Sequence, residues 1–186
     1  MIKIFNIILR VIYVLSGLYF LTINLNLLNV LLCAFCFIGS LLLGYLRKKS
    51  IIRTYGLSIV SDLFLFFSTI LGTCYGFYGL INGYDDFLHV WSGFIAVAMA
   101  FNLLLITNKD DLNVSKLFVI IYLFMFSMGV ASLWEICEFS IDNLLGMNTQ
   151  AGGLNDTMVD MIDGLIGTVI MILFYLKRIT KYGNTD

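Results

Sequence analysis

Six apolar stretches, each long enough to cross a bilayer, follow one another along almost the whole chain. They cover residues 4–22, 26–46, 57–81, 86–107, 115–140 and 157–177. A helix of about 20 apolar residues spans the hydrocarbon core of a membrane, and in lipid the backbone polar groups must be satisfied within the helix itself. We therefore expect an all-α fold, a polytopic transmembrane helical bundle with about six spans.

The composition agrees with a chain that lies mostly in lipid. Of its 186 residues, 60% are hydrophobic and 12% are charged, whereas soluble domains carry about 25% charged residues. The first apolar stretch has a thin positive flank and no small-residue cleavage site, so we expect no cleavable signal peptide. We expect a single integral membrane domain over residues 1–186, with an N-terminal helical hairpin over 1–46 and a four-helix core over 57–178.

Basic residues indicate the orientation, because they concentrate on the cytoplasmic side of helical membrane proteins. With the six spans above, every lysine and arginine falls on the same side of the membrane. They are Lys3, Arg10, Arg47, Lys48, Lys49, Arg53, Lys109, Lys116, Lys177, Arg178 and Lys181. We therefore expect a multi-pass membrane protein with both termini in the cytoplasm.

Acidic residues show the opposite distribution, and the first of three acidic stretches is NGYDDFLHVWSG. Asp85 or Asp86 opens the fourth span, and His89 lies one turn deeper on the same helix face. Capping of the helix N-terminus explains one aspartate, but it does not explain a second aspartate together with a histidine. A lone histidine is also compatible with a hydrogen-bonded packing role.

The second acidic stretch, ASLWEICEFSIDN, closes the fifth span. Glu135, Glu138 and Asp142 are spaced i, i+3 and i+7, which places them on one helix face. Carboxylates near a helix C-terminus oppose the helix dipole, and an ionisable group costs about 2.5–3.5 kcal/mol at the centre of the membrane. We expect Glu135 and Glu138 to have a role beyond solvation, and Asp142 to be a solvated residue at the loop edge.

The third stretch, LNDTMVDMIDG, leads into the sixth span. Asp156, Asp160 and Asp163 are spaced i, i+4 and i+7. Asp156 or Asn155 can cap the sixth span, which explains Asp156, whereas Asp160 and Asp163 lie about 6 and 10 Å further along the helix. Ionisable residues at such a depth indicate a functional site.

The three stretches are expected to meet at one membrane depth, where clustered carboxylates cannot all be ionised without a counter-charge. Protonation, a divalent metal or a cationic substrate would each resolve this. Oxygen ligands with one imidazole suit Mg, Mn, Zn or Fe, although a strong ligand signature such as H-E-x-x-H is absent. The predicted metal ligands are Asp85, Asp86, His89, Glu135, Glu138, Asp156, Asp160 and Asp163.

Several other residues favour structural interpretations. Asp62, inside the third span, is expected to bond to neighbouring polar groups or to pair with Arg53. Small residues permit close helix approach in lipid, and this is the role expected for Gly72, Gly76, Gly79, Gly164 and Gly167.

The cysteines and the last outer loop also have simple interpretations. Cysteines in apolar runs are typically small buried hydrophobes, which is the expectation for Cys33, Cys36, Cys74 and Cys137. In the loop GMNTQAGGLN, Gln150 is expected either to orient a ligand or to belong to a plain flexible connector.

Three motifs resemble those of a known family. YDDFLHVWSG (84–93), LWEICEF (133–139) and GGLNDTMVDMIDGLIG (152–167) are similar to the YjdF-like bacterial inner-membrane proteins, a family without an established activity. The last motif is also distantly similar to the end of VanZ-like proteins, which are linked to teicoplanin resistance. The resemblance covers about 110 C-terminal residues. It implies a location in the bacterial plasma (inner) membrane and one shared site built from the aspartates, the histidine and the paired glutamates.

Three classes of function fit this pattern. The leading hypothesis is a metal-dependent envelope enzyme acting on a lipid or lipid-linked phosphate, with Glu135, His89 and Asp160 as catalytic residues. The sequence offers no lysine or arginine on that side to hold an anionic head group. The alternatives are a cation or proton transporter or channel, and a non-catalytic protein in which a bound ion links the helices. The expected partners are membrane lipids and a lipid-linked or cationic substrate, and nothing indicates nucleic-acid binding.

Overall fold

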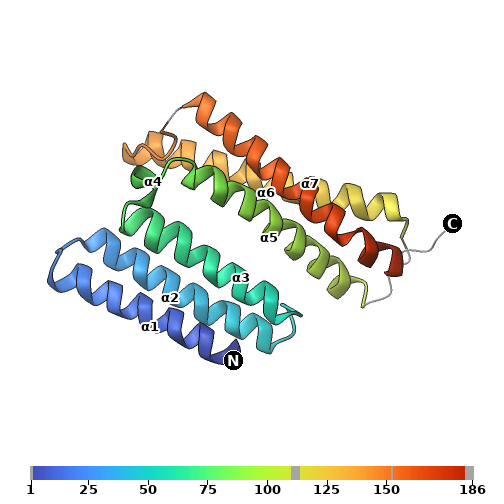
Figure 1. The fold of residues 1–186 in the computed structure, drawn as a ribbon, viewed down its shortest axis with the longest axis horizontal. Helices are drawn as coiled ribbons and strands as arrows, with labels where there is room; N and C mark the ends of the chain where they lie inside the picture. The colour runs from blue at the N-terminus through green and yellow to red at the C-terminus, as the bar shows by residue number, and fades with distance from the viewer. Residues whose placement is uncertain (1, 110–113, 152, 183–186) are drawn as a thin grey trace. The chain divides into compact units, whose positions relative to one another are not determined.

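The chain is helical in the computed structural model, which describes residues 2–109, 114–151 and 153–182 (Figure 1). The helices are α1 (Ile2–Thr22), α2 (Leu27–Lys48), α3 (Tyr55–Leu65), the π-helix η1 (Phe66–Cys74), α4 (Phe77–Leu80), α5 (Tyr84–Thr107), α6 (Lys116–Leu145) and α7 (Leu154–Tyr182). The described residues include six helical segments that are long and apolar enough to cross a membrane. They confirm the predicted all-α polytopic fold.

The bounds of the six membrane-spanning segments lie within a few residues of the predicted bounds, except at the end of the third and the fifth span. The segments are Ile4–Thr22, Leu27–Lys48, Tyr55–Cys74, Tyr84–Thr107, Lys116–Leu145 and Leu154–Ile179. By compactness the chain divides into two units, Met1–Tyr84 and Asp85–Asp186. The predicted single domain, with its hairpin and four-helix core, stays a prediction.

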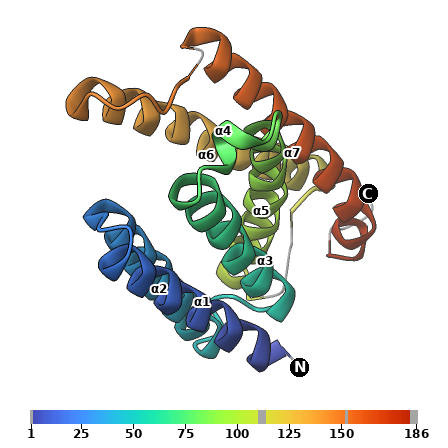
Figure 2. The ribbon, with the colours of Figure 1, turned by 60° about the vertical axis from the view of Figure 1, so that its left-hand side comes forward.

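The first unit is built around the hairpin of α1 and α2, which lie side by side (Figure 2). The turn between them closes on Asn26, whose side chain caps α2 by accepting a hydrogen bond from the Asn29 backbone N–H at 3.1 Å. Its buried hydrophobic core contains Leu9, Tyr13, Phe20, Cys33, Cys36, Ile70 and Cys74. The prediction that Cys33, Cys36 and Cys74 are buried hydrophobes is therefore confirmed.

The third span corrects the prediction of one continuous helix over 57–81. After α3 the chain widens into η1, and the Tyr75 N–H bonds to the Ile70 carbonyl at 3.0 Å. Gly76 then has a φ of +76°, which stops the helix because a left-handed residue cannot continue it. Gly72 faces the ring of Tyr78, where a Cβ would lie 2.5 Å from Cε2. Gly76 is thus a helix breaker rather than a packing residue.

A hydrogen-bonded network joins the three long helices of this unit around Asp62, which is fully buried. The Asp62 carboxylate accepts hydrogen bonds from Ser40 Oγ on α2 at 2.8 Å and from the Tyr13 hydroxyl on α1 at 3.1 Å. Arg10 in turn donates to the Oγ of Ser40 at 3.0 Å and to its carbonyl at 2.7 Å. The predicted bonding of Asp62 to neighbouring polar groups is confirmed, with Ser40 and Tyr13 as those groups.

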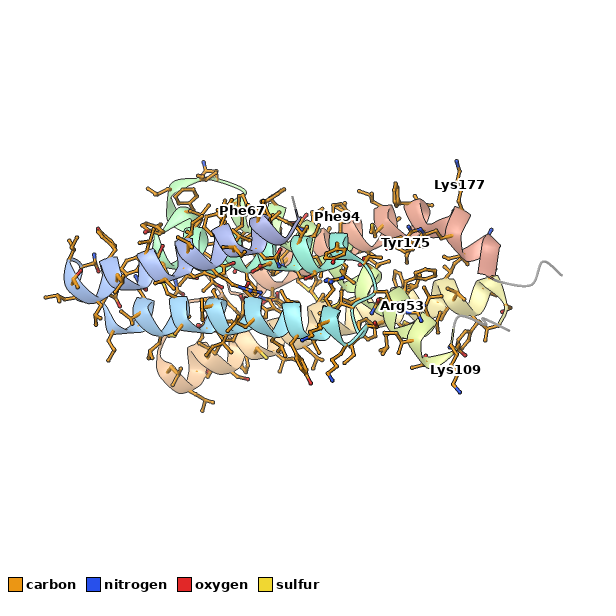
Figure 3. The ribbon with its side chains drawn as sticks, turned by 90° about the horizontal axis from the view of Figure 1, so that it is seen from below. Arg53, Phe67, Phe94, Lys109, Tyr175 and Lys177 are labelled. Atoms are coloured by element: carbon orange, nitrogen blue, oxygen red, sulfur yellow. The ribbon has the colours of Figure 1, made fainter. Side chains whose placement is uncertain are left out.

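The second unit consists of α5, α6 and α7. Within this unit, Lys109 and Lys177 lie near the end where α5 finishes and α7 approaches its own C-terminus (Figure 3). The start of α5, the end of α6 and the start of α7 meet at the opposite end, because consecutive helices run in opposite directions. The three acidic stretches therefore share one end of the unit. Cys137, on α6, is exposed, so its predicted burial is wrong; its helix face turns outward.

Candidate metal site in the second unit

The first turns of α5 provide two aspartates and the histidine. Asp85 and Asp86 occupy the first turn, where the positive end of the helix dipole favours carboxylates. His89 follows one turn later and is 7% exposed. Its Nε2 atom lies 3.4 Å from Asp85 Oδ1, the i, i+4 distance expected for residues stacked on one face. This half of the site is thus built from local sequence spacing alone.

Helix α7 brings a second carboxylate to the same histidine. Asp160 is 2% exposed, and its Oδ1 atom lies 3.7 Å from His89 Nε2. Asp163, almost one turn further along, is partly buried, and Asp156 lies in the first turn of α7. The helix begins at Leu154, so Asp156 is a first-turn residue rather than the predicted cap. His89 therefore links α5 to α7 through Asp160, while Asp85 contacts it from its own helix.

Helix α6 adds the two glutamates. Glu135 is 6% exposed, and neither of its carboxylate oxygens has a hydrogen-bond partner. Glu138, one turn later, is partly buried. Carboxylate oxygens that are removed from water and left unpaired cost several kcal/mol. This orphaned group is aimed at the carboxylates of α7, since Glu135, Glu138 and Asp160 have ligand atoms within 4.8 Å of one another.

Among the described residues, three sets of ligand atoms lie close enough together to hold a metal ion. Asp160 belongs to all three sets. The three sets are Asp85, His89 and Asp160; Asp86, Asp160 and Asp163; and Glu135, Glu138 and Asp160. In each set the ligand atoms lie within 4.8 Å of one another. Seven of the eight residues predicted as ligands are therefore brought together, and Asp156 belongs to none of the three sets.

The site has little compensating charge of its own. The sequence contains no lysine or arginine between Arg53 and Lys109 or between Lys116 and Lys177. One oxygen each of Asp156, Asp160 and Asp163 is buried without a hydrogen-bond partner, as are both oxygens of Glu135. The unpaired oxygens of Glu135, Asp160 and Asp163, together with one imidazole, can accept a cation, because hard divalent ions are held by oxygen ligands.

A close crossing of α5 and α7 fixes the spacing of His89 and Asp160. A Cβ atom on Gly93 would lie 2.5 Å from the Gly164 carbonyl oxygen, and one on Gly167 would overlap the Val90 carbonyl. The two backbones therefore touch one turn below the ligands. The predicted packing role of Gly167 is confirmed, and Gly93 is a partner that the sequence reasoning missed.

Two buried hydroxyls connect this crossing to α6. Ser127 and Thr168 are hydrogen-bonded to each other at 2.7 Å, and the Gly93 carbonyl oxygen, 3.4 Å from Ser127 Oγ, is an alternative acceptor. Thr168 donates to the Gly164 carbonyl at 2.7 Å. Isolated hydroxyl residues inside apolar runs were the available signal for this network, because in lipid such groups bond across helices.

The loop between α6 and α7 is held down by Asp142. Its carboxylate accepts hydrogen bonds from the Thr149 N–H and hydroxyl, both at 2.7 Å, and from the Gln150 N–H at 2.9 Å. The side chain of Gln150 donates to the Thr157 hydroxyl at 2.6 Å. Asp142 is therefore a loop anchor rather than a merely solvated residue, and the Gln150 side chain bridges the loop to α7.

Fold and site together define a polytopic helical membrane protein that carries a buried acidic cluster with one histidine. Residues 3–181 match the model of a family described as predicted membrane protein (DUF2238), and the chain belongs to this family. An uncharacterised protein of Thermotoga maritima is 30% identical over 120 residues, which are 63% of this chain and 61% of that protein. The match thus spans about three fifths of the relative. No solved structure matches the chain.

Proposed function

We propose that the second unit holds a divalent metal ion and acts as a membrane-embedded enzyme on a lipid or lipid-linked phosphate. One observation carries this proposal: Asp160 is shared by three sets of potential ligands beside Glu135, whose two oxygens are buried and unpaired. The unpaired oxygens and the crowded carboxylates both cost free energy. A bound cation offsets this cost, because it supplies a partner for the oxygens and a positive charge for the carboxylates.

The residue types fit a hard or borderline metal. Carboxylate oxygens with a single imidazole suit Mg²⁺, Mn²⁺, Zn²⁺ or Fe²⁺, whereas soft ions prefer thiolates. Asp160, Glu135 and His89 are the proposed core ligands, with Asp85, Asp86, Glu138 and Asp163 around them. A divalent ion held there would polarise a phosphoryl oxygen or activate a water molecule.

The surroundings of the site in the second unit are shielded from water and, among the described residues, lack positively charged side chains. Glu135 and His89 are buried, which keeps bulk water away from the ion that they would hold. No lysine or arginine from the adjacent parts of α5, α6 and α7 can hold the phosphate. A phosphorylated substrate would therefore depend on the metal for charge neutralisation, so substrate binding should require the ion.

One observation favours a second candidate, a non-catalytic protein in which an ion links helices. The ligands come from all three helices of the unit, so a bound ion would tie α5, α6 and α7 together. This reading shares the metal with the leading one and differs only in the absence of turnover. The transporter alternative lacks a comparable observation in the second unit.

We also propose that the protein lies in the bacterial inner membrane with both termini in the cytoplasm, as a YjdF-like protein. The acidic end of the second unit would then face the outer side, and its lysines the cytoplasm. Membership of the family agrees with the YjdF-like motifs. The likeness to VanZ-like proteins stays a hypothesis that concerns residues 152–167 alone.

Metal analysis of the purified protein tests the proposal. Wild-type protein, prepared without chelator and measured by plasma mass spectrometry, should contain at least about one divalent ion per chain. The double variant Asp160→Asn and Glu135→Gln preserves side-chain size and should lose the ion. Asp156→Asn is the matched control, since Asp156 belongs to none of the three ligand sets, and should retain it. Wild-type protein that carries no metal, even after equilibration with each ion, would overturn the proposal.

Turnover separates the enzyme from the ion-linked scaffold. Metal-loaded protein should release phosphate from a lipid-linked diphosphate in detergent micelles, and the double variant should not. A protein that binds metal and releases no phosphate from any phospholipid or lipid-linked phosphate would favour the scaffold.

A further inference from the structure

A second polar site lies in the first unit, between α1, α2 and α3. There a cavity of about 440 Å³ is lined by basic and polar residues. The residues that carry the argument are Asn6, Arg10, Arg47, Lys48, Tyr55 and Ser58. None of these residues belongs to the acidic cluster.

Three cations line this cavity. Arg10 is oriented by its two hydrogen bonds to Ser40, and the guanidinium of Arg47 stacks on the ring of Tyr55 at 3.4 Å. Lys48 is exposed and free to follow a ligand. Planar guanidinium groups held in fixed positions are the preferred side chains for binding phosphate oxygens. The arrangement therefore favours a phosphate group.

Ser40 connects Arg10 to the Asp62 carboxylate, because its hydroxyl accepts a hydrogen bond from Arg10 and donates one to Asp62. Asp62 accepts two hydrogen bonds. Its oxygens bond to the Ser40 and Tyr13 hydroxyls. The two hydrogen bonds of Arg10 go to a neutral hydroxyl and a carbonyl, so its guanidinium retains a positive charge that can bind an anion. The cavity therefore presents positive charge to a ligand.

Two buried polar atoms of the cavity wall lack partners. Ser58 is 1% exposed, and its hydroxyl oxygen makes no hydrogen bond; the side-chain oxygen of Asn6 is also buried and unpaired. The serine hydroxyl can donate to a phosphate oxygen, whereas the asparagine oxygen can only accept a hydrogen bond. A buried hydroxyl without a partner costs free energy until a ligand supplies one.

The cavity also combines charge with apolar surface. Ile7 and Ile59 line it beside the cations, and Ile7 is 56% exposed. Gly44 leaves the space that Arg10 occupies, because a Cβ there would lie 2.9 Å from Arg10 Nη2. Basic pockets between transmembrane helices on the cytoplasmic side bind the phosphate groups of anionic lipids.

We propose that this cavity is a binding site for a phosphate group, and that the phosphate belongs to the head group of an anionic phospholipid. The guanidinium groups of Arg10 and Arg47 and the ammonium of Lys48 bind the phosphate oxygens. The Ser58 hydroxyl donates a further hydrogen bond, and the isoleucines contact the apolar part of the lipid. This site is independent of the proposed metal site.

Thermal unfolding of the full-length protein in a neutral detergent tests the site. Phosphatidylglycerol at micromolar concentration should raise the midpoint of unfolding by several degrees, and phosphatidylcholine should not. A parallel measurement with millimolar inorganic phosphate distinguishes a lipid head group from free phosphate as the ligand. Stabilisation by inorganic phosphate alone would keep the phosphate site and overturn its assignment to a lipid. Equal effects of the two lipids without any effect of phosphate would overturn the proposal.

Variants connect the effect to the cavity. Arg47→Gln with Lys48→Gln should weaken the affinity for phosphatidylglycerol roughly 30-fold, which corresponds to two charges at about 1 kcal/mol each. Lys49→Gln removes a neighbouring charge that does not line the cavity, and should leave the affinity within about threefold of wild type. Ser58→Ala should weaken binding without lowering the stability of the lipid-free protein. Equal losses in the Lys49 control and the double variant would overturn the assignment to this cavity.

Discussion

Asp62 shows how a single carboxylate is accommodated at membrane depth. It is fully buried, and its partners lie on two other helices. A structural role for Asp62 was predictable from the sequence, because a carboxylate inside an apolar run requires polar neighbours. The partners Ser40 and Tyr13 were not predictable, because they lie 22 and 49 residues away in the chain. Which residues face Asp62 depends on how the helices are rotated about their axes.

Ser40→Ala should destabilise the protein by about 1–3 kcal/mol, the cost of leaving a buried partner unpaired. The substitution removes a donor from Asp62 and the Oγ acceptor of Arg10 Nε. Ser140→Ala is the matched control, because the Ser140 hydroxyl is exposed and bonds only to the Ile136 carbonyl of its own helix. The control should stay within about 0.5 kcal/mol of wild type. Unfolding in mixed micelles measures both, and equal losses would contradict the role of the network.

At the scale of helices, the crossing of α5 and α7 determines the candidate site. The sequence predicted which residues share a helix face, since i, i+4 and i+7 spacing is a local property. The contact of Gly93 with Gly167 is not local, and small residues recur in apolar helices for many reasons. The same limit explains η1 and Gly76, where hydropathy indicated one continuous span and a left-handed residue ends the helix.

Gly167→Ala should destabilise the protein by about 1–3 kcal/mol or more and reduce its metal content. The added methyl would overlap the Val90 carbonyl, which is backbone and cannot rotate away, so α5 and α7 must separate. Gly129→Ala is the matched control, since a Cβ there meets no atom within 4 Å. The control should be neutral or slightly stabilising, because alanine favours a helix over glycine. Wild-type stability of the Gly167 variant would contradict the close crossing.

For the whole molecule, the segregation of charge predicts its direction in the membrane. The three acidic stretches lie at one end of the second unit, and Lys109 and Lys177 lie near the other end (Figure 3). The number of spans and their type were predictable from sequence, because the bilayer imposes both a length and a composition. The arrangement of ligands was predictable only as a cluster, because the depth and rotation of each helix depend on tertiary packing.

A cysteine at Ala151, an exposed loop residue, should react with an impermeant maleimide in intact spheroplasts. A cysteine at Ile51, which is exposed near the basic break after α2, should react only after the membrane is opened. Both variants are made in a Cys137→Ser background, because Cys137 is exposed. The reverse pattern of labelling would place the termini outside and contradict the proposed orientation.

The Gly93–Gly167 contact also bears on how the site tolerates change. Where two backbones touch, the separation of the helices is set by peptide atoms and not by the size of intervening side chains. Substitutions on the exposed faces of α5 and α7, or a bilayer of different thickness, then leave the distance between His89 and Asp160 unaltered. We therefore expect substitutions of lipid-facing residues on these two helices to preserve the spacing of the ligands.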